Sequence, residues 1–258
     1  MKNIANLFPT NLLKSQPELT HAFSPRSLKR KDGTMGELNF ASDDPLARLN
    51  LQWFLRSIGI NKEDVFLVRQ VHGDVVYDLK NTSASPAQVA EVQADAIITR
   101  LTDMPIGVLT ADCVPVVVYD TRLQVTGVIH AGRKGTALKI VSKTIRAMQN
   151  FYGCDLENIL VEMGPGIGGC CYEVDKDCIE PFKKLYPDLA SMYKPLPSGK
   201  FMLDLFVANE EDARMAGIDP KNISQSGICT SCQVEHFFSY RREGKTGRML
   251  TVAMLTPR

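Results

Sequence analysis

The sequence predicts an α/β fold, a single domain in which mixed β-sheets are flanked by helices. The chain has 258 residues, of which 44% are hydrophobic, as is usual for one large globular domain. Runs rich in Val and Ile alternate with segments of helical periodicity, but some runs also follow one another directly, which favours mixed over purely parallel sheets. No linker or repeat marks a boundary, so we assign residues 1–258 to one domain.

The first half of the chain contains one predicted helix and several predicted strands. Asp43-Asp44-Pro45 precedes apolar residues at helical spacing and Gly59 follows them, which predicts a capped helix with Pro45 in its first turn. A His72-Gly73 turn is expected within residues 65–77, with a strand on either side. Buried strands are predicted at 95–99, 106–109, 114–119 and 125–129.

The second half alternates helices and strands. Residues 136–150 place apolar side chains on one helical face, and Gly153 stands just beyond. Residues 158–163 predict a strand that ends in a glycine-rich turn at 164–169. Further helices are expected at about 175–185 and 204–215, the second ending at Gly217. The last predicted strands are 223–229, 237–241 and 249–255, with a hairpin turn at 243–245.

Charge and hydropathy exclude several classes of function. The chain carries 30 Lys and Arg against 29 Asp and Glu, and this balance argues against a nucleic-acid or anionic-membrane partner. No apolar run approaches the ~20 residues of a membrane helix. Residues 1–16 contain Asn, Pro and Lys where a signal peptide would need an apolar stretch. We therefore expect a soluble, cytoplasmic protein that acts on small molecules.

The cysteines and histidines argue against copper oxidase chemistry. An odd number of cysteines, seven, in a long chain indicates reduced thiols rather than a disulfide framework. The four histidines are scattered and form no His-x-His pair. No histidine follows Cys113 until His130, so the short spacing of a blue-copper site is missing as well.

Three segments place a metal ligand beside Gly or Pro at the end of a predicted strand. They contain His72, Cys113 and His130. Two imidazoles and one thiolate would make a three-ligand zinc site with the fourth position free, as in catalytic zinc sites. Alternatively, Cys113 is a small buried hydrophobic residue and each histidine an ordinary loop residue. The long spacings leave both interpretations open.

A series of short motifs runs through the chain in order: HAFSxR (21–26), LN (38–39), RQVHG (69–73), ADA (94–96), LTADCVP (109–115), HAG (130–132), GPGI (164–167), CCYEV (170–174), LDL (203–205), CT (229–230) and FFSYRR (237–242). No single motif is specific, but their order and number are. Together they resemble the YfiH-type laccase-domain family, also labelled polyphenol oxidase or peptidoglycan editing factor. The resemblance extends nearly end to end and implies that His72, Cys113 and His130 bind zinc.

The same resemblance implies a purine nucleoside phosphorylase with broad base tolerance (adenosine, inosine, guanosine, methylthioadenosine) and adenosine deaminase activity. Copper would be an adventitious ligand, because it outcompetes zinc at most nitrogen and sulfur sites. Zinc lowers the pKa of a bound water to about 7 and so supplies hydroxide for deamination. Deamination also needs a proton shuttle, for which Asp112 and Glu173 are candidates. The alternative role of Asp112 is to orient a zinc ligand.

Phosphorolysis needs a phosphate site near the sugar. Arg26, Arg69 and Arg241 lie within the motifs, and a guanidinium suits bidentate phosphate binding. Gln70 and Glu173 complete the candidate substrate-binding residues. The alternative for any of these arginines is an ordinary ion pair, which we prefer for Arg242. The glycine run 164–169 would either present N–H groups to an anion or form a tight turn that brings Cys170 and Tyr172 near the site.

The chain departs from the family pattern after His130. The usual His-Ala-Gly-Trp-Arg-Gly is here His-Ala-Gly-Arg133-Lys134-Gly. Arg133 replaces the aromatic residue, and Lys134 replaces the usual Arg, so the planar guanidinium fork is missing at position 134. Affinity or specificity should change if this segment touches substrate, and little should change if it only begins a helix.

A Cys229-x-x-Cys232 pair raises the question of a second metal. With Cys170, Cys171, Cys154 or Cys178 it would complete a structural zinc site. A single CxxC lacks its second pair, however, so the sequence argues against this site.

Two other classes of function are compatible with these residues. In a zinc or cysteine hydrolase of a peptidoglycan precursor, Cys113 would be a nucleophile activated by His130. In a non-catalytic, zinc-stabilised scaffold, His21 or His236 would close the zinc shell. The oligomeric state is left open by the sequence.

Overall fold

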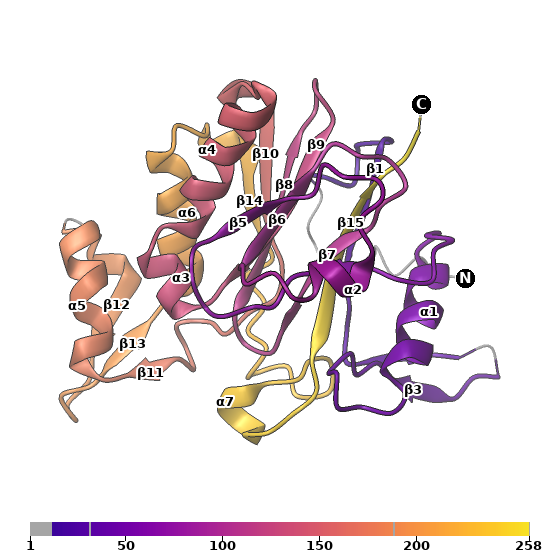
Figure 1. The fold of residues 1–258 in the computed structure, drawn as a ribbon. Helices are drawn as coiled ribbons and strands as arrows, with labels where there is room; N and C mark the ends of the chain where they lie inside the picture. The colour runs from indigo at the N-terminus through magenta and orange to yellow at the C-terminus, as the bar shows by residue number, and fades with distance from the viewer. Residues whose placement is uncertain (1–11, 31, 188, 258) are drawn as a thin grey trace.

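A six-stranded mixed sheet forms the centre of the protein in the computed structural model, which describes residues 12–30, 32–187 and 189–257 (Figure 1). Residues 1–11, most of the segment judged unlike a signal peptide, lie outside the described residues. The strand order is β14-β10-β8-β9-β6-β5. Neighbours pair antiparallel except β10 with β14 and β5 with β6. The strands are β5 (Val76–Asp78), β6 (Ala96–Thr99), β8 (Val114–Asp120), β9 (Val125–Ala131), β10 (Ile159–Met163) and β14 (Ile223–Gln225).

A four-stranded sheet packs against one face of this sheet. Its order is β1-β15-β7-β4, formed by β1 (Leu19–Phe23), β15 (Met249–Leu255), β7 (Ile106–Thr110) and β4 (Phe66–Leu67). Alternation along β8 explains the packing, because Val117 and Tyr119 join the core between the sheets, whereas Val116 and Val118 point into the helix-covered core. A strand buried on both faces needs apolar residues at every position, which is why it reads as a continuous Val-rich run.

Helices cover the second face of the six-stranded sheet (Figure 1). They are α3 (Arg133–Ala137), α4 (Ile140–Tyr152) and α6 (Leu205–Met215), the last capped by the Asp204 carboxylate. Helix α5 (Lys176–Leu185) packs beside a small sheet of β11 (Glu173–Val174), β13 (Phe201–Leu203) and β12 (Tyr193–Pro195). Short 3₁₀ helices are η2 (Leu156–Asn158), η3 (Ala190–Met192) and η4 (Pro220–Asn222).

The outer face of the four-stranded sheet carries helix α1 (Ala47–Ser57), whose Phe54 and Leu55 pack on Leu250 and Val252 of β15. The hairpin β2 (Ser27–Lys29) and β3 (Met35–Glu37) lies nearby. The remaining helices are α2 (Pro86–Val89), which begins with a capping box, and α7 (Tyr240–Glu243). No helix formed by the described residues is both long and apolar enough to cross a membrane.

The predicted fold class, mixed sheets flanked by helices, is confirmed, and so are the Val- and Ile-rich strands. Three other predictions need adjustment. The strands on either side of His72 are short and join different sheets, so they do not pair with each other. Helix α1 begins at Ala47, two residues after Pro45, while the Asp44 carboxylate accepts from the N–H of Leu46. The final part of the predicted 223–229 strand continues as loop.

The helix predicted at 136–150 is wrong as a single element. The chain forms α3 and α4, separated at Lys139, whose φ of 63° is left-handed. The buried Asp212 carboxylate of α6 accepts from the N–H of Ser142 at 3.0 Å and so satisfies the start of α4. A contact between distant segments therefore decides where the helix restarts.

The strand predicted at 237–241 is also wrong. Phe237 and Phe238 are buried in a small cluster with Met249, and the chain then turns into α7. The Arg242 guanidinium donates to the Phe237 carbonyl at 3.0 Å. This carbonyl is therefore not available for a sheet ladder, and residues 243–245 end a short helix instead of forming a hairpin turn.

Candidate active site

Three chain segments from the two large sheets bring His72, Cys113 and His130 together. His72 lies between β4 and β5, Cys113 in the bend between β7 and β8, and His130 near the end of β9. Their ligand atoms all lie within 4.8 Å of one another. Two of the three segments therefore connect a strand of the four-stranded sheet to a strand of the six-stranded sheet, and the third lies on a strand of the six-stranded sheet.

The backbone at this point adopts uncommon conformations. His72 and Asp112 have φ values of 59° and 88°, which non-glycine residues rarely adopt and which often mark functional sites. A Cβ atom at Gly132 would lie 2.9 Å from Cys113 Sγ and 3.1 Å from His72 Cδ2. Glycine at 132 therefore allows the three ligands to approach each other.

Asp95 positions two of the three candidate metal ligands, His72 and His130, through hydrogen bonds. Its fully buried carboxylate accepts from His130 Nδ1 at 2.7 Å and from the N–H groups of His72 and Gly73 at 2.9 and 2.6 Å. Because a carboxylate only accepts, Nδ1 of His130 carries the proton and Nε2 is left for a metal. Asp95 stands in the ADA motif, but no role was predicted for it from the sequence. The feature that could have indicated a role is an acidic residue at the start of an apolar buried strand.

Electrostatics favours a thiolate at Cys113. Burial would raise the pKa of the thiol, but the charge of His130 and hydrogen bonds from both histidines outweigh it and lower the pKa to about 6. Burial would also lower the pKa of His130, whereas Cys113 and Asp95 raise it to about 9. A thiolate at neutral pH is the form of cysteine that binds metals and acts as a nucleophile.

The three ligands open into a cavity of about 1340 Å³. This volume exceeds the ~300–1000 Å³ typical of small-molecule sites, so the cavity is large enough for a small-molecule ligand. Cationic side chains dominate its charged lining, and two tyrosines provide aromatic surface: Arg133, Lys134, Arg241, Lys245, Arg248, Tyr172 and Tyr240. Lys245 and Arg248 were not predicted from the sequence as site residues, because they follow the FFSYRR motif without belonging to it.

Asp112 and Arg241 are linked at the cavity wall. The Asp112 carboxylate accepts from Thr230 Oγ1 at 2.7 Å and from the backbone N–H of Arg241 at 2.6 Å. The Arg241 guanidinium lies over the ring of Tyr172, 5.1 Å from its centre. Asp112 therefore holds the loop of Thr230 and the start of α7 in place, and Arg241 is carried by α7 rather than by a strand end.

Three of the predicted substrate-binding residues do not line this cavity among the described residues: Arg26, Arg69 and Glu173. Arg26 donates to the Val234 carbonyl and pairs with Glu243, the Arg69 side chain is exposed, and Glu173 pairs with Lys200.

Gln70 lines the cavity, but its side-chain amide exchanges two hydrogen bonds of 2.8 Å with the backbone of Leu109. It therefore ties the His72 loop to β7.

The structure bears on the alternatives left open for two neighbouring segments, the glycine run 164–169 and Arg133-Lys134. In the glycine run 164–169, the N–H groups of Gly166 and Ile167 donate to the carbonyls of Ile228 and Asp112, so they are not available to an anion. The turn itself follows at residues 168–172, where the N–H groups of Cys171 and Tyr172 donate to the carbonyl of Gly168. Arg133 and Lys134 both begin α3 and line the cavity. Among the described residues, the three-ligand group includes neither His21 nor His236.

Comparison with known proteins identifies the class to which this fold and site belong. Residues 20–256 match the family described as multi-copper polyphenol oxidoreductase laccase, so the chain belongs to that family. It is similar to adenosine deaminase RL5 from an unknown prokaryotic organism, with 33% identity over 83% of this chain and 84% of that protein. It is also 31% identical to mouse purine nucleoside phosphorylase LACC1 over 82% of this chain, and the match spans about half, 49%, of the mouse protein.

Solved structures agree with this assignment. The Bacillus licheniformis hypothetical protein YfiH superposes with a TM-score of 0.86 at 27% identity, over 94% of this chain and 95% of that one. YlmD from Geobacillus stearothermophilus gives a TM-score of 0.83 at 25% identity, over 94% and 93%. The resemblance to the YfiH-type family and its fold are thereby confirmed.

Proposed function

We propose that this chain is a zinc-dependent purine nucleoside phosphorylase that accepts adenosine, inosine, guanosine and methylthioadenosine and also deaminates adenosine. The observation that carries the proposal is a three-ligand group opening into a large cavity with a cationic lining. Relatives named purine nucleoside phosphorylase and adenosine deaminase support it. The active unit would be one domain, 1–258, acting in the cytoplasm with free thiols.

His72, Cys113 and His130 would hold the zinc ion. Two imidazoles and a thiolate fit zinc, and a three-residue set leaves one position for water or substrate. When bound, zinc supplies Lewis-acid chemistry and a water of lowered pKa. Copper would enter the same site only adventitiously.

The cationic side chains would bind phosphate. In phosphorolysis a phosphate oxygen forms a bond to the anomeric carbon, and the C–N glycosidic bond breaks, so that its electron pair leaves with the purine, which takes a proton. Arg241 is our candidate for phosphate because its guanidinium lines the cavity and its backbone is held by Asp112. Tyr172 and Tyr240 offer faces for the purine ring.

Asp112 would act mainly by position, because both carboxylate oxygens already accept hydrogen bonds. Gln70 would likewise position the His72 loop. Arg26, Arg69 and Glu173 lie outside the lining, so they could reach substrate only after a rearrangement.

Product analysis with inosine tests the proposal. Zinc-loaded protein should release hypoxanthine and ribose 1-phosphate only when inorganic phosphate is present, and a Cys113→Ala variant should lose this activity. Hypoxanthine formed at the same rate without phosphate, together with free ribose, would show a hydrolase instead. No turnover of any purine nucleoside by fully loaded protein would reject the proposal.

One observation favours a second candidate, a cysteine hydrolase of a peptidoglycan precursor. The lowered pKa of Cys113 and the raised pKa of His130 are those of an activated nucleophile–base pair. A zinc-bound thiolate would be largely spent as a nucleophile. Hydrolysis of such a precursor by chelator-treated protein, lost in Cys113→Ala, would therefore favour this candidate over the phosphorylase.

A further inference from the structure

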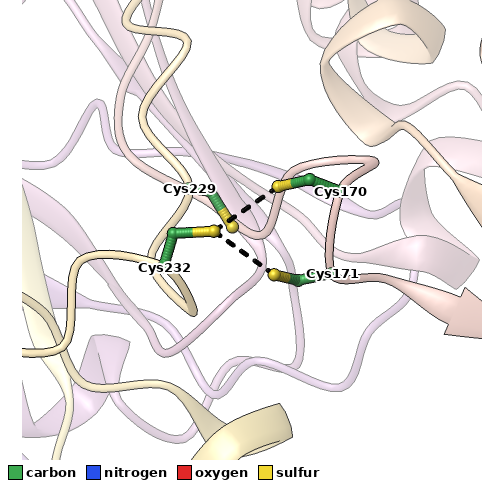
Figure 2. Close-up of side chains that lie close together, drawn as sticks. All are labelled: Cys170, Cys171, Cys229 and Cys232. Carbon is green, nitrogen blue, oxygen red and sulfur yellow. Dashed lines mark hydrogen bonds between the residues drawn. The ribbon is translucent and has the colours of Figure 1, made fainter.

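Four cysteine side chains converge outside the site described above. Cys170 and Cys171 follow the glycine-rich turn after β10, and Cys229 and Cys232 lie in the loop between β14 and α7. Figure 2 shows the four side chains pointing toward one another from these two loops. All four sulfur atoms lie within 4.8 Å of one another.

The sulfur separations match those of a tetrahedral metal site. Cys232 Sγ lies 3.6 Å from Cys170 Sγ and 3.4 Å from Cys171 Sγ. Four thiolates at the usual zinc–sulfur bond length of about 2.3 Å stand ~3.8 Å apart at the corners of a tetrahedron. These distances are much longer than the ~2.05 Å of a disulfide bond.

Core packing does not account for the cluster. A free cysteine usually serves as a small buried hydrophobic residue. Here Cys170 and Cys232 are exposed and Cys171 is half-buried, so burial of apolar surface is not what brings them together.

The backbone around Cys229 is arranged to stabilise a thiolate. The N–H of Gly168 donates to Cys229 Sγ at 3.3 Å, and the N–H of Cys232 donates to the same sulfur. A Cβ atom at Gly168 would lie 3.3 Å from Cys229 Cβ, so glycine lets the two loops close.

We propose that Cys170, Cys171, Cys229 and Cys232 form a second metal site, which holds one Zn²⁺ through four thiolates and has a structural role. Binding would release four thiol protons and leave no open coordination position, as in structural zinc sites. The sequence argued against this site because the partner of the CxxC pair is an adjacent Cys-Cys pair rather than a second CxxC.

The site would hold two loops that shape the cavity. Thr230, inside the CxxC turn, donates to Asp112, and Tyr172, next to Cys171, lies under Arg241. The ion would therefore crosslink the loop that carries Tyr172 to the loop that positions Asp112. Its existence does not depend on the proposed enzymatic reaction.

Metal analysis of separate variants tests the proposal without any activity assay. Protein purified under reducing, anaerobic conditions should contain about two zinc ions per chain by elemental analysis. Cys113→Ala should retain the zinc of the four-cysteine site, and a Cys229→Ser/Cys232→Ser variant should retain only the other. The matched control is Cys178→Ser, which removes a cysteine outside both groups and should keep both ions.

The absorption spectrum of cobalt-loaded protein identifies the ligand atoms. Cys113→Ala loaded with Co²⁺ should show the strong thiolate-to-cobalt charge-transfer bands of a four-sulfur site. These bands should be lost when Cys229→Ser and Cys232→Ser are added to Cys113→Ala. Cys232→His provides a second test that does not depend on the folding of the Cys229→Ser/Cys232→Ser variant. Three cysteines and one histidine also make a zinc site, so this variant should still bind zinc.

Three results would overturn the proposal. The first is that purified Cys113→Ala contains no zinc. The second is that elemental analysis finds iron in place of zinc. The third is that mass spectrometry shows a stoichiometric disulfide among these cysteines in the anaerobic protein.

Discussion

Asp95 shows how a single side chain can organise a candidate metal-binding group, that of His72, Cys113 and His130, to which it does not itself belong. Its carboxylate accepts from His130 Nδ1 and from three successive backbone N–H groups, those of Val71, His72 and Gly73. It thus fixes the ring of one ligand and the backbone of another. Burial would raise its pKa, but His130 and the N–H of Gly73 outweigh burial and lower the pKa, so the charge that performs this role is retained.

Alkylation of metal-free protein by iodoacetamide should reveal the lowered pKa of Cys113. The thiolate reacts, and its fraction rises as the pH rises through the pKa, so the rate at Cys113 should increase up to about pH 6–7 and then level off. Cys154 is the internal control, because burial and the nearby Asp120 raise its pKa to about 12 and keep it unreactive across this range. Peptide mass spectrometry measures both sites in one sample. A Cys113 profile with its midpoint near the ordinary value of about 8.5 would contradict the thiolate assignment.

At the scale of elements, the short helix α7 directs two adjacent arginine side chains to different surroundings, Arg241 to the cavity and Arg242 to the preceding loop. The Arg241 guanidinium lines the cavity. The guanidinium of Arg242 instead donates to the carbonyls of Thr230, Ser231 and Phe237, and so joins α7 to the preceding loop. A one-residue step along a helix rotates the side chain by about 100°, which separates a ligand-facing residue from a structural one.

Arg241→Ala should raise the KM for phosphate more than the KM for nucleoside. The reason is that the change removes a guanidinium from the proposed phosphate site, where its hydrogen bonds to phosphate would be charge-assisted. The matched control is Arg242→Ala, which should lower the melting temperature while the ratio of the two KM values stays unchanged. Steady-state kinetics with each substrate varied in turn measures the effect. Equal increases in both KM values for Arg241→Ala would make this residue structural.

At the scale of the whole molecule, a part-buried hydrogen bond between His21 and Glu162 connects the two large sheets. His21 Nε2 of β1 lies 3.1 Å from Glu162 Oε1 of β10, and the second carboxylate oxygen accepts from the N–H of Leu13 at 3.0 Å. Because the Glu162 side chain is inaccessible to water, water cannot replace these partners.

Glu162→Ala should lower the free energy of unfolding by about 3 kcal/mol, since it leaves buried donors without an acceptor. Urea denaturation measures the loss. Lys221→Ala, which removes an exposed pair with Asp219, is the control and should leave stability nearly unchanged. A similarly small effect for Glu162→Ala would mean that the two sheets are held together without this contact.

The sequence by itself determined the parts of this protein that depend on local pattern. Strands buried on both faces need continuous Val and Ile, and β8 and β9 were therefore predictable within two residues of their ends. His72, Cys113 and His130 were singled out because each stands beside Gly or Pro at a strand end, and the structure places their ligand atoms within 4.8 Å.

Only the tertiary structure decided what depends on contacts between distant segments. The break at Lys139, the loop at 237–239, the role of Asp95 and the convergence of four cysteines each need a partner from elsewhere in the chain. Local propensities differ by only about 1 kcal/mol per residue, so one buried hydrogen bond or charge can override them. The apolar pattern of residues 237–241 indicated burial correctly for residues 237–239, whereas Tyr240 is 60% exposed. Burial alone also does not distinguish a strand from an apolar loop.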